Sequence, residues 1–207
     1  MKKIILSAIA VMLCGFANAQ DVKIGIKGSL NLSSWVGDTR GMNLRPMFGV
    51  NIGALAQIKL TNELDIQPEV LYSNQVIKKK NAGTNVFGVY YTGDIKWNLC
   101  YINVPVLFKY SADDKSFIEA GPQLGFLTSA KASTKLTQYS PIVKQDVKEA
   151  FESIDFGFVI GVGYNINQHL MADLRYNIGL SNIAKTESGD DTKIRNSVLA
   201  LSLAYKF

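Results

Sequence analysis

The sequence predicts an all-β protein, a single eight-stranded antiparallel up-and-down β-barrel that spans a membrane. Three observations predict this fold class. Eight segments alternate apolar residues with small or polar ones, which is the period of a β-strand. The connections between these segments alternate long and short along the chain. Glycine and a nearly balanced set of charges fall on one face of the strands, while the other face is uncharged.

The N-terminal segment has the three parts of a secretory signal peptide. Lys2 and Lys3 precede the apolar run Ile4–Phe16, and Ala17-Asn18-Ala19 has the A-x-A form of a cleavage site. We therefore expect residues 1–19 to be removed and residues 20–207 to form the barrel domain. No apolar run of about 18 residues comes after the signal, so no transmembrane helix is predicted.

The first half of the mature chain predicts four strands, at Asp21–Leu32, Pro46–Leu60, Glu63–Asn74 and Trp97–Tyr110. Each places apolar side chains at every second position, with glycine, amide or charged side chains between them. Two long polar segments, Ser33–Arg45 and Gln75–Lys96, are predicted to be loops. The run Lys78–Lys80 in the second loop fits a solvated surface, with lipopolysaccharide phosphates as the alternative contact.

The second half predicts four more strands, at Ser116–Thr128, Ile154–Ile166, His169–Leu180 and Lys193–Phe207. Long polar segments at Ser129–Ser153 and Ser181–Thr192 alternate with short turns. Eight antiparallel strands connected in this way place every long connection at one end and both termini at the other. Outer-membrane barrels have this layout, with long extracellular loops and short periplasmic turns.

The orientation of the two faces separates a membrane barrel from a soluble one. A soluble, lipocalin-like barrel would turn the apolar face inward around an apolar ligand, whereas a membrane barrel turns it toward lipid. The glycines favour the membrane barrel, because inward side chains compete for room in a narrow lumen and glycine weakens an exposed strand. Apolar-face aromatics also lie near strand ends, as interfacial girdles do; they are Tyr72, Phe108, Tyr110, Phe126, Tyr164, Tyr176, Tyr205 and Phe207.

The charges on the polar face predict a lumen that is filled with side chains. Six basic and five acidic residues fall on that face, and buried charges need partners. The candidates for a structural network are Glu69, Lys109, Glu119, Asp173 and Arg175. A small diffusion pore is the alternative to a filled lumen.

Three prolines, Pro68, Pro105 and Pro122, lie inside predicted strands. Every strand of a closed barrel is paired on both sides, and proline removes a hydrogen-bond donor from the ladder. We therefore expect bulges or widened ladder spacing at these positions.

Four motifs resemble the outer-membrane β-barrel family described as PorT-like or "porin family protein". They are QPEVLY at 67–72, YINVPVLFKY at 101–110, GPQLG at 121–125 and RYNIGLSNI at 175–183. Asn103 departs from the carboxylate that many members carry there. The resemblance implies an eight-stranded barrel in the cell outer membrane and leaves the biochemical activity open.

The chain offers little for catalysis or cofactor binding. His169 is the only histidine, and a hydrolase needs a histidine beside its nucleophile. Cys100 is the only cysteine of the mature chain, so neither a metal cluster nor an internal disulfide is expected. We expect no enzyme, no cofactor and, from a formal net charge of only +5 before signal removal, no nucleic-acid partner.

The function is therefore expected to reside in the extracellular loops, or in envelope assembly or secretion. The expected surroundings are outer-membrane lipid and lipopolysaccharide, around a monomer. Tyr205 and Phe207 at the end of the last strand resemble the aromatic ending that the barrel-assembly machinery recognises in outer-membrane proteins. We interpret these two residues as the insertion signal.

Overall fold

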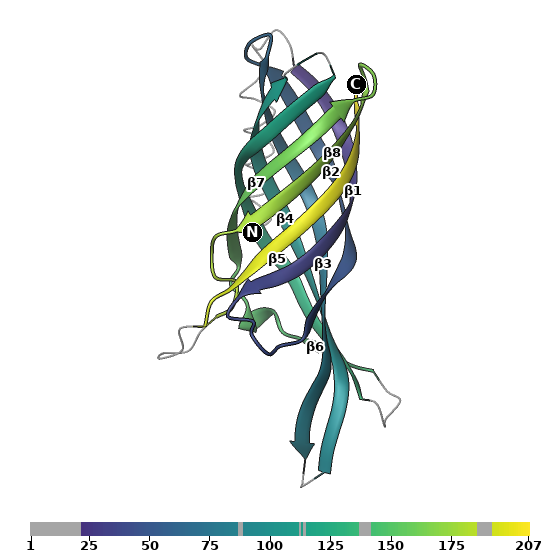
Figure 1. Cartoon of the computed structure of the whole chain (residues 1–207), viewed down its shortest axis with the longest axis vertical. Helices are drawn as coiled ribbons and strands as arrows, with labels where there is room; N and C mark the ends of the chain where they lie inside the picture. Colours follow the sequence, from purple (N-terminus) through teal and green to yellow (C-terminus); the bar gives the residue numbers. More distant parts are fainter. Residues whose placement is uncertain (1–21, 87–88, 112, 114, 137–141, 186–191) are drawn as a thin grey trace.

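Within the part of the chain that the structure describes, eight long antiparallel strands close into a barrel (Figure 1). This computed structural model describes residues 22–86, 89–111, 113, 115–136, 142–185 and 192–207. The long strands are β1 Val22–Gly37, β2 Leu44–Lys59, β3 Leu64–Val86, β4 Val89–Ser111, β5 Ser116–Leu136, β7 Ile154–Asn165, β8 Leu170–Gly179 and β9 Ile194–Lys206. Each pairs with its neighbour in sequence, and β1 pairs with β9 to complete the ring. The predicted fold class is confirmed.

Two shorter elements lie between β5 and β7. Strand β6, Val143–Asp146, pairs with the last part of β5, and the helical turn η1, Lys148–Ala150, comes next. Among the described residues, no helix is both long and apolar enough to cross a membrane.

The two ends of the barrel differ as the connection lengths predict. The turns β2–β3, β4–β5 and β7–β8 lie together at the upper end of Figure 1, where β9 also finishes. We call this the short-turn end, and the opposite one the long-loop end. Side chains stabilise the turns directly: the Thr61 Oγ1 accepts hydrogen bonds from the backbone N–H groups of Glu63 and Leu64. Hydrogen bonds from the backbone N–H groups of Ser116 and Lys115 likewise lower the pKa of Asp113 from its ordinary value.

The apolar face lies outside the barrel and the polar face inside it. Leu30 and its partner Leu201 are 59% and 60% exposed, whereas Lys27 and Asn31 on the alternate positions are buried. The soluble alternative requires the opposite arrangement, with the apolar face around an inner cavity. The outward belt of branched apolar side chains is suited to lipid, and exposed aromatics lie at both ends of it, including Phe48, Tyr110 and Phe207.

The prediction of a loop over Gln75–Lys96 is wrong for most of that segment. Strands β3 and β4 continue as a hairpin with Lys79 opposite Ile95 and Gly83 opposite Thr92, and the hairpin projects past the barrel (Figure 1). The reason is tertiary. Ile77 and Leu99 turn inward into a buried cluster, so pairing and packing outweigh the polar composition. Strand β5 similarly extends to Leu136, into a segment predicted to be loop.

The prolines interrupt the ladder without changing its register. In the β3–β4 ladder, two positions between Pro68 and Leu71 have no paired partner. In the β4–β5 ladder, the same is true of two positions between Pro105 and Phe108. The register is the same on either side of each interruption, so no bulge accompanies the missing donors; the widened ladder spacing stays a prediction. The bulges lie elsewhere, for example between Met47 and Val50 on β2.

Candidate functional site

The middle of the lumen is closed by a buried ionic cluster centred on Arg175 of β8. Its guanidinium donates two hydrogen bonds to Glu69 of β3, with N–O distances of 2.8 and 2.9 Å. It donates two more to Glu119 of β5, at 2.5 and 3.0 Å. A third carboxylate, that of Asp173, has an oxygen 3.1 Å from the Arg175 Nε. Only a guanidinium has the planar fork that can bridge two carboxylates bidentately from the same site.

Lys27 of β1 and Gln67 of β3 complete the ionic cluster. The Lys27 Nζ lies 2.5 Å from Asp173 and 3.6 Å from Glu69, and the Gln67 amide donates to Glu69 at 2.6 Å. Two cations thus share three carboxylates across strands that are distant in sequence. Lys27 is one of the six basic residues that the strand period predicts on the inward face, but it was not predicted in the network, because only the register of β1 against β9 and β8 brings it to Asp173.

Lys109 lies apart from the ionic cluster. Its side chain is fully buried, with the Nζ 3.5 Å from the centroid of the Phe117 ring and 3.3 Å from the Met171 sulfur. This is a cation–π contact over an apolar layer formed by Leu55, Phe117, Met171 and Ala204. The five predicted network residues therefore divide into four that meet at Arg175 and one that sits nearer the short-turn end.

Gly161 of β7 provides the space that the ionic cluster needs. A Cβ at this position would lie 2.9 Å from the Arg175 Cγ, 2.9 Å from the Glu119 Oε1 and 3.1 Å from the Leu174 backbone oxygen. These atoms are fixed by the ion pairs and the ladder, so they cannot move aside without losing hydrogen bonds.

We expect Gly161→Ala to lower the free energy of unfolding by about 1–3 kcal/mol, because it overpacks the lumen. Urea unfolding in lipid vesicles, followed by tryptophan fluorescence, measures the change. Gly28→Ala is the matched control, since Gly28 faces outward on β1 and a Cβ there meets nothing within 4 Å. Equal losses in the two variants would contradict the role assigned to Gly161.

Toward the long-loop end the lumen contains hydrogen-bonded amides and then an apolar plug. The Asn196 amide donates to Asp155 at 2.8 Å, and the Asn31 amide donates to Asn51 at 2.7 Å. Beyond them a buried cluster fills the mouth; it consists of Trp35, Ile77, Leu99, Tyr101, Leu127, Ala130, Phe151 and Ile183. The Trp35 ring lies 5.1 Å from the Trp97 ring and 5.8 Å from the Phe151 ring.

Backbone hydrogen bonds between the β5–β7 connection and the β8–β9 connection hold the plug in place. The backbone N–H of Glu152 donates to the Ile183 oxygen, and that of Lys185 donates to the Ala150 oxygen. Phe151 and Ala184 form an isolated antiparallel bridge. Sequence periodicity did not predict that Phe151 and Ile183 belong to the plug, since each is a single apolar residue in a segment that is otherwise polar.

The hairpin of β3 and β4 presents charges beyond the plug. Lys78 and Asp94 form an ion pair at 2.7 Å, with both side chains about one-third exposed. The hydrogen bond from Lys78 lowers the pKa of Asp94 from its ordinary value. Nearby, Arg45 and Lys80 are exposed and line a shelf of about 640 Å³ with Asn43, Leu44, Pro46 and Asn81.

The remaining candidate residues have ordinary local partners. His169 stacks on Tyr205 with 5.7 Å between ring centroids, and its Nδ1 lies 2.9 Å from the Lys206 backbone oxygen. Cys100 is a half-buried free thiol. The side chain of Phe207 packs edge-on against Tyr205 at 5.4 Å, and its backbone N–H donates to Ile24 of β1.

A closed ring of strands with a lipid-suited exterior and an ionic interior defines an integral outer-membrane β-barrel. Residues 18–185 match the family model described as outer membrane protein beta-barrel domain, and the chain belongs to this family. The protein is located in the cell outer membrane. No curated protein sequence matches the chain.

Solved structures show the same fold. The chain is similar to Ail, the attachment invasion locus protein of Yersinia pestis, at 14% identity and a TM-score of 0.51, over 91% of this chain and 100% of that one. It is similar to Neisserial surface protein A (NspA) at 16% identity and a TM-score of 0.52, with the same two coverages. At these identities the likeness concerns the fold alone.

Proposed function

We propose that this protein is a closed, monomeric barrel that acts through its extracellular end, without conducting solutes and without catalysis. The observation that carries the proposal is the double closure of the lumen, by the Arg175 cluster in the middle and the Trp35 plug at the long-loop end. The cavity beside the ionic cluster has a volume of only about 40 Å³. By comparison, the open cavity at the short-turn end has a volume of about 460 Å³, so the space in the lumen narrows sharply at the ionic cluster.

The purified protein is expected to give no steady single-channel openings in planar bilayers. An ion crossing the lumen would have to break hydrogen bonds among buried charges and then pass the apolar plug. A wide-lumen porin reconstituted in the same way is the positive control. Steady, reproducible conductance steps from the folded protein would overturn the proposal of a closed barrel.

The extracellular end carries a surface suited to the phosphates of lipopolysaccharide. Outer-membrane barrels place their long connections outside the cell, so the β3–β4 hairpin and the shelf face that side. On the shelf, Arg45 and Lys80 have no carboxylate within ion-pair distance among the described residues. Unpaired cations at the height of lipid head groups attract phosphate, and guanidinium binds it with two hydrogen bonds.

The variant Arg45→Ala/Lys80→Ala is expected to lose most of the stabilisation that added lipopolysaccharide gives the folded barrel. The measurement is the urea midpoint in vesicles with and without lipopolysaccharide, at low and high salt. The matched control is Lys131→Ala/Lys144→Ala, which removes the same charge from exposed positions outside the shelf. If both double variants keep the full lipopolysaccharide response, phosphates are not held at the shelf.

Envelope assembly or secretion is the second candidate function. It is favoured by the motifs at 67–72, 101–110, 121–125 and 175–183, which resemble PorT-like proteins. A partner of this kind would reach the barrel from either side of the membrane. Site-specific photo-cross-linking in cells at Asn81 of the hairpin, compared with Asn62 of the β2–β3 turn, distinguishes the two sides. Adducts confined to Asn62 would favour an assembly role on the periplasmic side over an extracellular one.

A further inference from the structure

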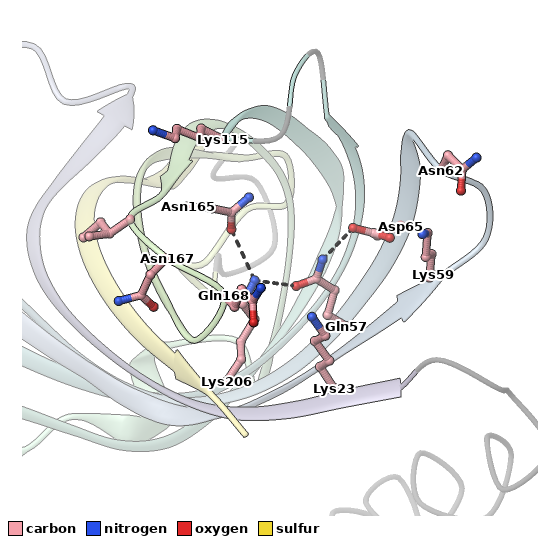
Figure 2. A pocket seen from close by; sticks show the side chains of 11 residues that line it. Lys23, Gln57, Lys59, Asn62, Asp65, Lys115, Asn165, Asn167, Gln168 and Lys206 are labelled. Carbon is pink, nitrogen blue, oxygen red and sulfur yellow. Dashed lines mark hydrogen bonds between the residues drawn. The ribbon is translucent and has the colours of Figure 1, made fainter.

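A cavity of about 460 Å³ opens at the short-turn end of the lumen, which faces the periplasm (Figure 2). We call it the vestibule. Its charged side chains come from four strands and one turn: Lys23 of β1, Lys59 of β2, Asp65 of β3, Lys115 before β5 and Lys206 of β9. Four lysines and one aspartate leave three positive charges in excess. The vestibule lies at the opposite end from the shelf, so a site there is independent of the function proposed for the extracellular end.

Lys206 is the most buried cation of the vestibule. Its side chain reaches into the cavity, yet the residue is only 4% exposed. The ammonium donates to the Gln57 Oε1 at 3.1 Å and to the Asn165 Oδ1 at 3.2 Å (Figure 2). Both acceptors are neutral amides, and an ammonium has three N–H donors, so one donor and the full charge stay available to the cavity.

The single carboxylate of the vestibule does not neutralise Lys206. Gln57 stands between the two: its side-chain oxygen accepts from the Lys206 ammonium, and its side-chain nitrogen donates to the Asp65 Oδ2 at 2.5 Å (Figure 2). No ion pair joins Asp65 to a cation among the described residues. The amide thus holds both charged groups in place and keeps them apart.

A second buried cation lies beneath the vestibule. Lys109 stands opposite Asp65 in the register of β3 and β4 and is fully buried, with its ammonium against the Phe117 ring and the Met171 sulfur. Within the described part of the chain, it forms no ion pair with a carboxylate. Glu119 and Asp65 act on this ammonium only from beyond ion-pair distance, and a buried cation whose charge is incompletely compensated is stabilised when a further anion comes near. Lys206, which lines the vestibule, and Lys109, which is buried behind the lining, therefore both stabilise a negative charge placed in the cavity.

We propose that the vestibule binds a phosphate group presented from the periplasmic side. Three excess positive charges match a group that carries more than one negative charge, and lysine binds phosphate as a point charge. The rim also contains the neutral amide side chains of Asn62, Asn167 and Gln168, which suit hydrogen bonds to the polar molecule that carries the phosphate. The volume is in the range of small-molecule sites, so the phosphate can belong to a soluble compound or to a lipid head group.

Isothermal titration with inorganic pyrophosphate tests this site on the folded mature protein in alkyl maltoside micelles, which contain no phosphate. The expected result is saturable binding with one site per chain that weakens as salt rises. Lys206→Gln keeps a polar side chain but removes the charge, and should weaken binding by roughly tenfold or more. Lys59→Gln, on the exposed rim, provides a second variant whose folding is not in question.

Lys144→Gln is the matched control, because Lys144 is an exposed lysine of β6 at the other end of the barrel and the change in net charge is identical. Unchanged affinity in both Lys206→Gln and Lys59→Gln would overturn the proposal, and so would an equal loss of affinity in Lys144→Gln. The absence of saturable binding at millimolar pyrophosphate would overturn it as well. Adding phosphatidylglycerol to the micelles assigns the source. Competition with pyrophosphate indicates a lipid head group, and its absence indicates a soluble phosphate compound.

Discussion

Replacing Arg175 with methionine is expected to lower the free energy of unfolding by about 3–5 kcal/mol. The side chain forms four hydrogen bonds to Glu69 and Glu119 and lies against Asp173, all in the middle of the lumen. Its removal leaves Lys27 as the remaining cation of this cluster, paired with Glu69 and Asp173 but not with Glu119. Urea unfolding in phosphatidylcholine vesicles, with the heat-dependent gel shift as a second readout of folding, measures the loss.

A second-site change separates loss of charge balance from loss of packing. In Arg175→Met/Glu119→Gln, one of the three carboxylates is removed, so part of the stability is expected to return. Lys59→Met, at an exposed position on β2, controls for the substitution itself. A loss below about 1 kcal/mol for Arg175→Met, the level of exposed ion pairs, would contradict the structural role of the cluster.

Deleting Tyr205–Phe207 is expected to remove most of the folded protein from the outer membrane, and Phe207→Ser to reproduce most of that defect. The reason we propose is that the barrel-assembly machinery recognises the aromatic end of β9. The Phe207 side chain is 69% exposed and contacts Tyr205 on the outer face, so it adds little to the interior. Fractionation of cell envelopes, followed by immunoblotting of heated and unheated samples, reports the level of folded barrel.

The control for this effect is Phe48→Ser. Phe48 is 74% exposed on the outer face of β2, so each variant removes a similar lipid-facing area, worth about 1.5–3 kcal/mol of transfer free energy. Phe207→Ser alone should impair assembly in cells, while both purified variants should fold in detergent. If Phe48→Ser reduces the outer-membrane level as much as Phe207→Ser does, the terminal aromatic has no special part in insertion.

Much of the fold could be predicted from alternation alone. The strand β7 was expected at Ile154–Ile166 and is found at Ile154–Asn165, because its apolar and glycine positions alternate without a break. The β3–β4 hairpin could not be predicted in this way. Its outer part, from Lys78 to Asp94, is polar in sequence and is paired because Ile77, Trp97 and Leu99 anchor its base in the plug.

The candidate sites divide in the same way. The inward position of Arg175, Glu69, Glu119 and Asp173 is a consequence of strand period, since side chains alternate between faces. Their mutual contacts, and the separate place of Lys109 over Phe117, depend on which residues share a height in the barrel. Height is fixed by register and strand tilt, and a sequence does not state either one.

By itself, the sequence determined the eight strands within the barrel wall, the direction of their faces and the ends at which long and short connections lie, because each of these is a local property of period and turn chemistry. The tertiary structure decided which charges are paired, what closes the lumen and where positive charge gathers. Arg175 gained three carboxylates from other positions of the chain, whereas the ammonium groups of Lys206 and Lys109 contact neutral amides, a ring and a thioether. Electrostatic contacts depend on distances of a few ångströms, which only the closed barrel sets.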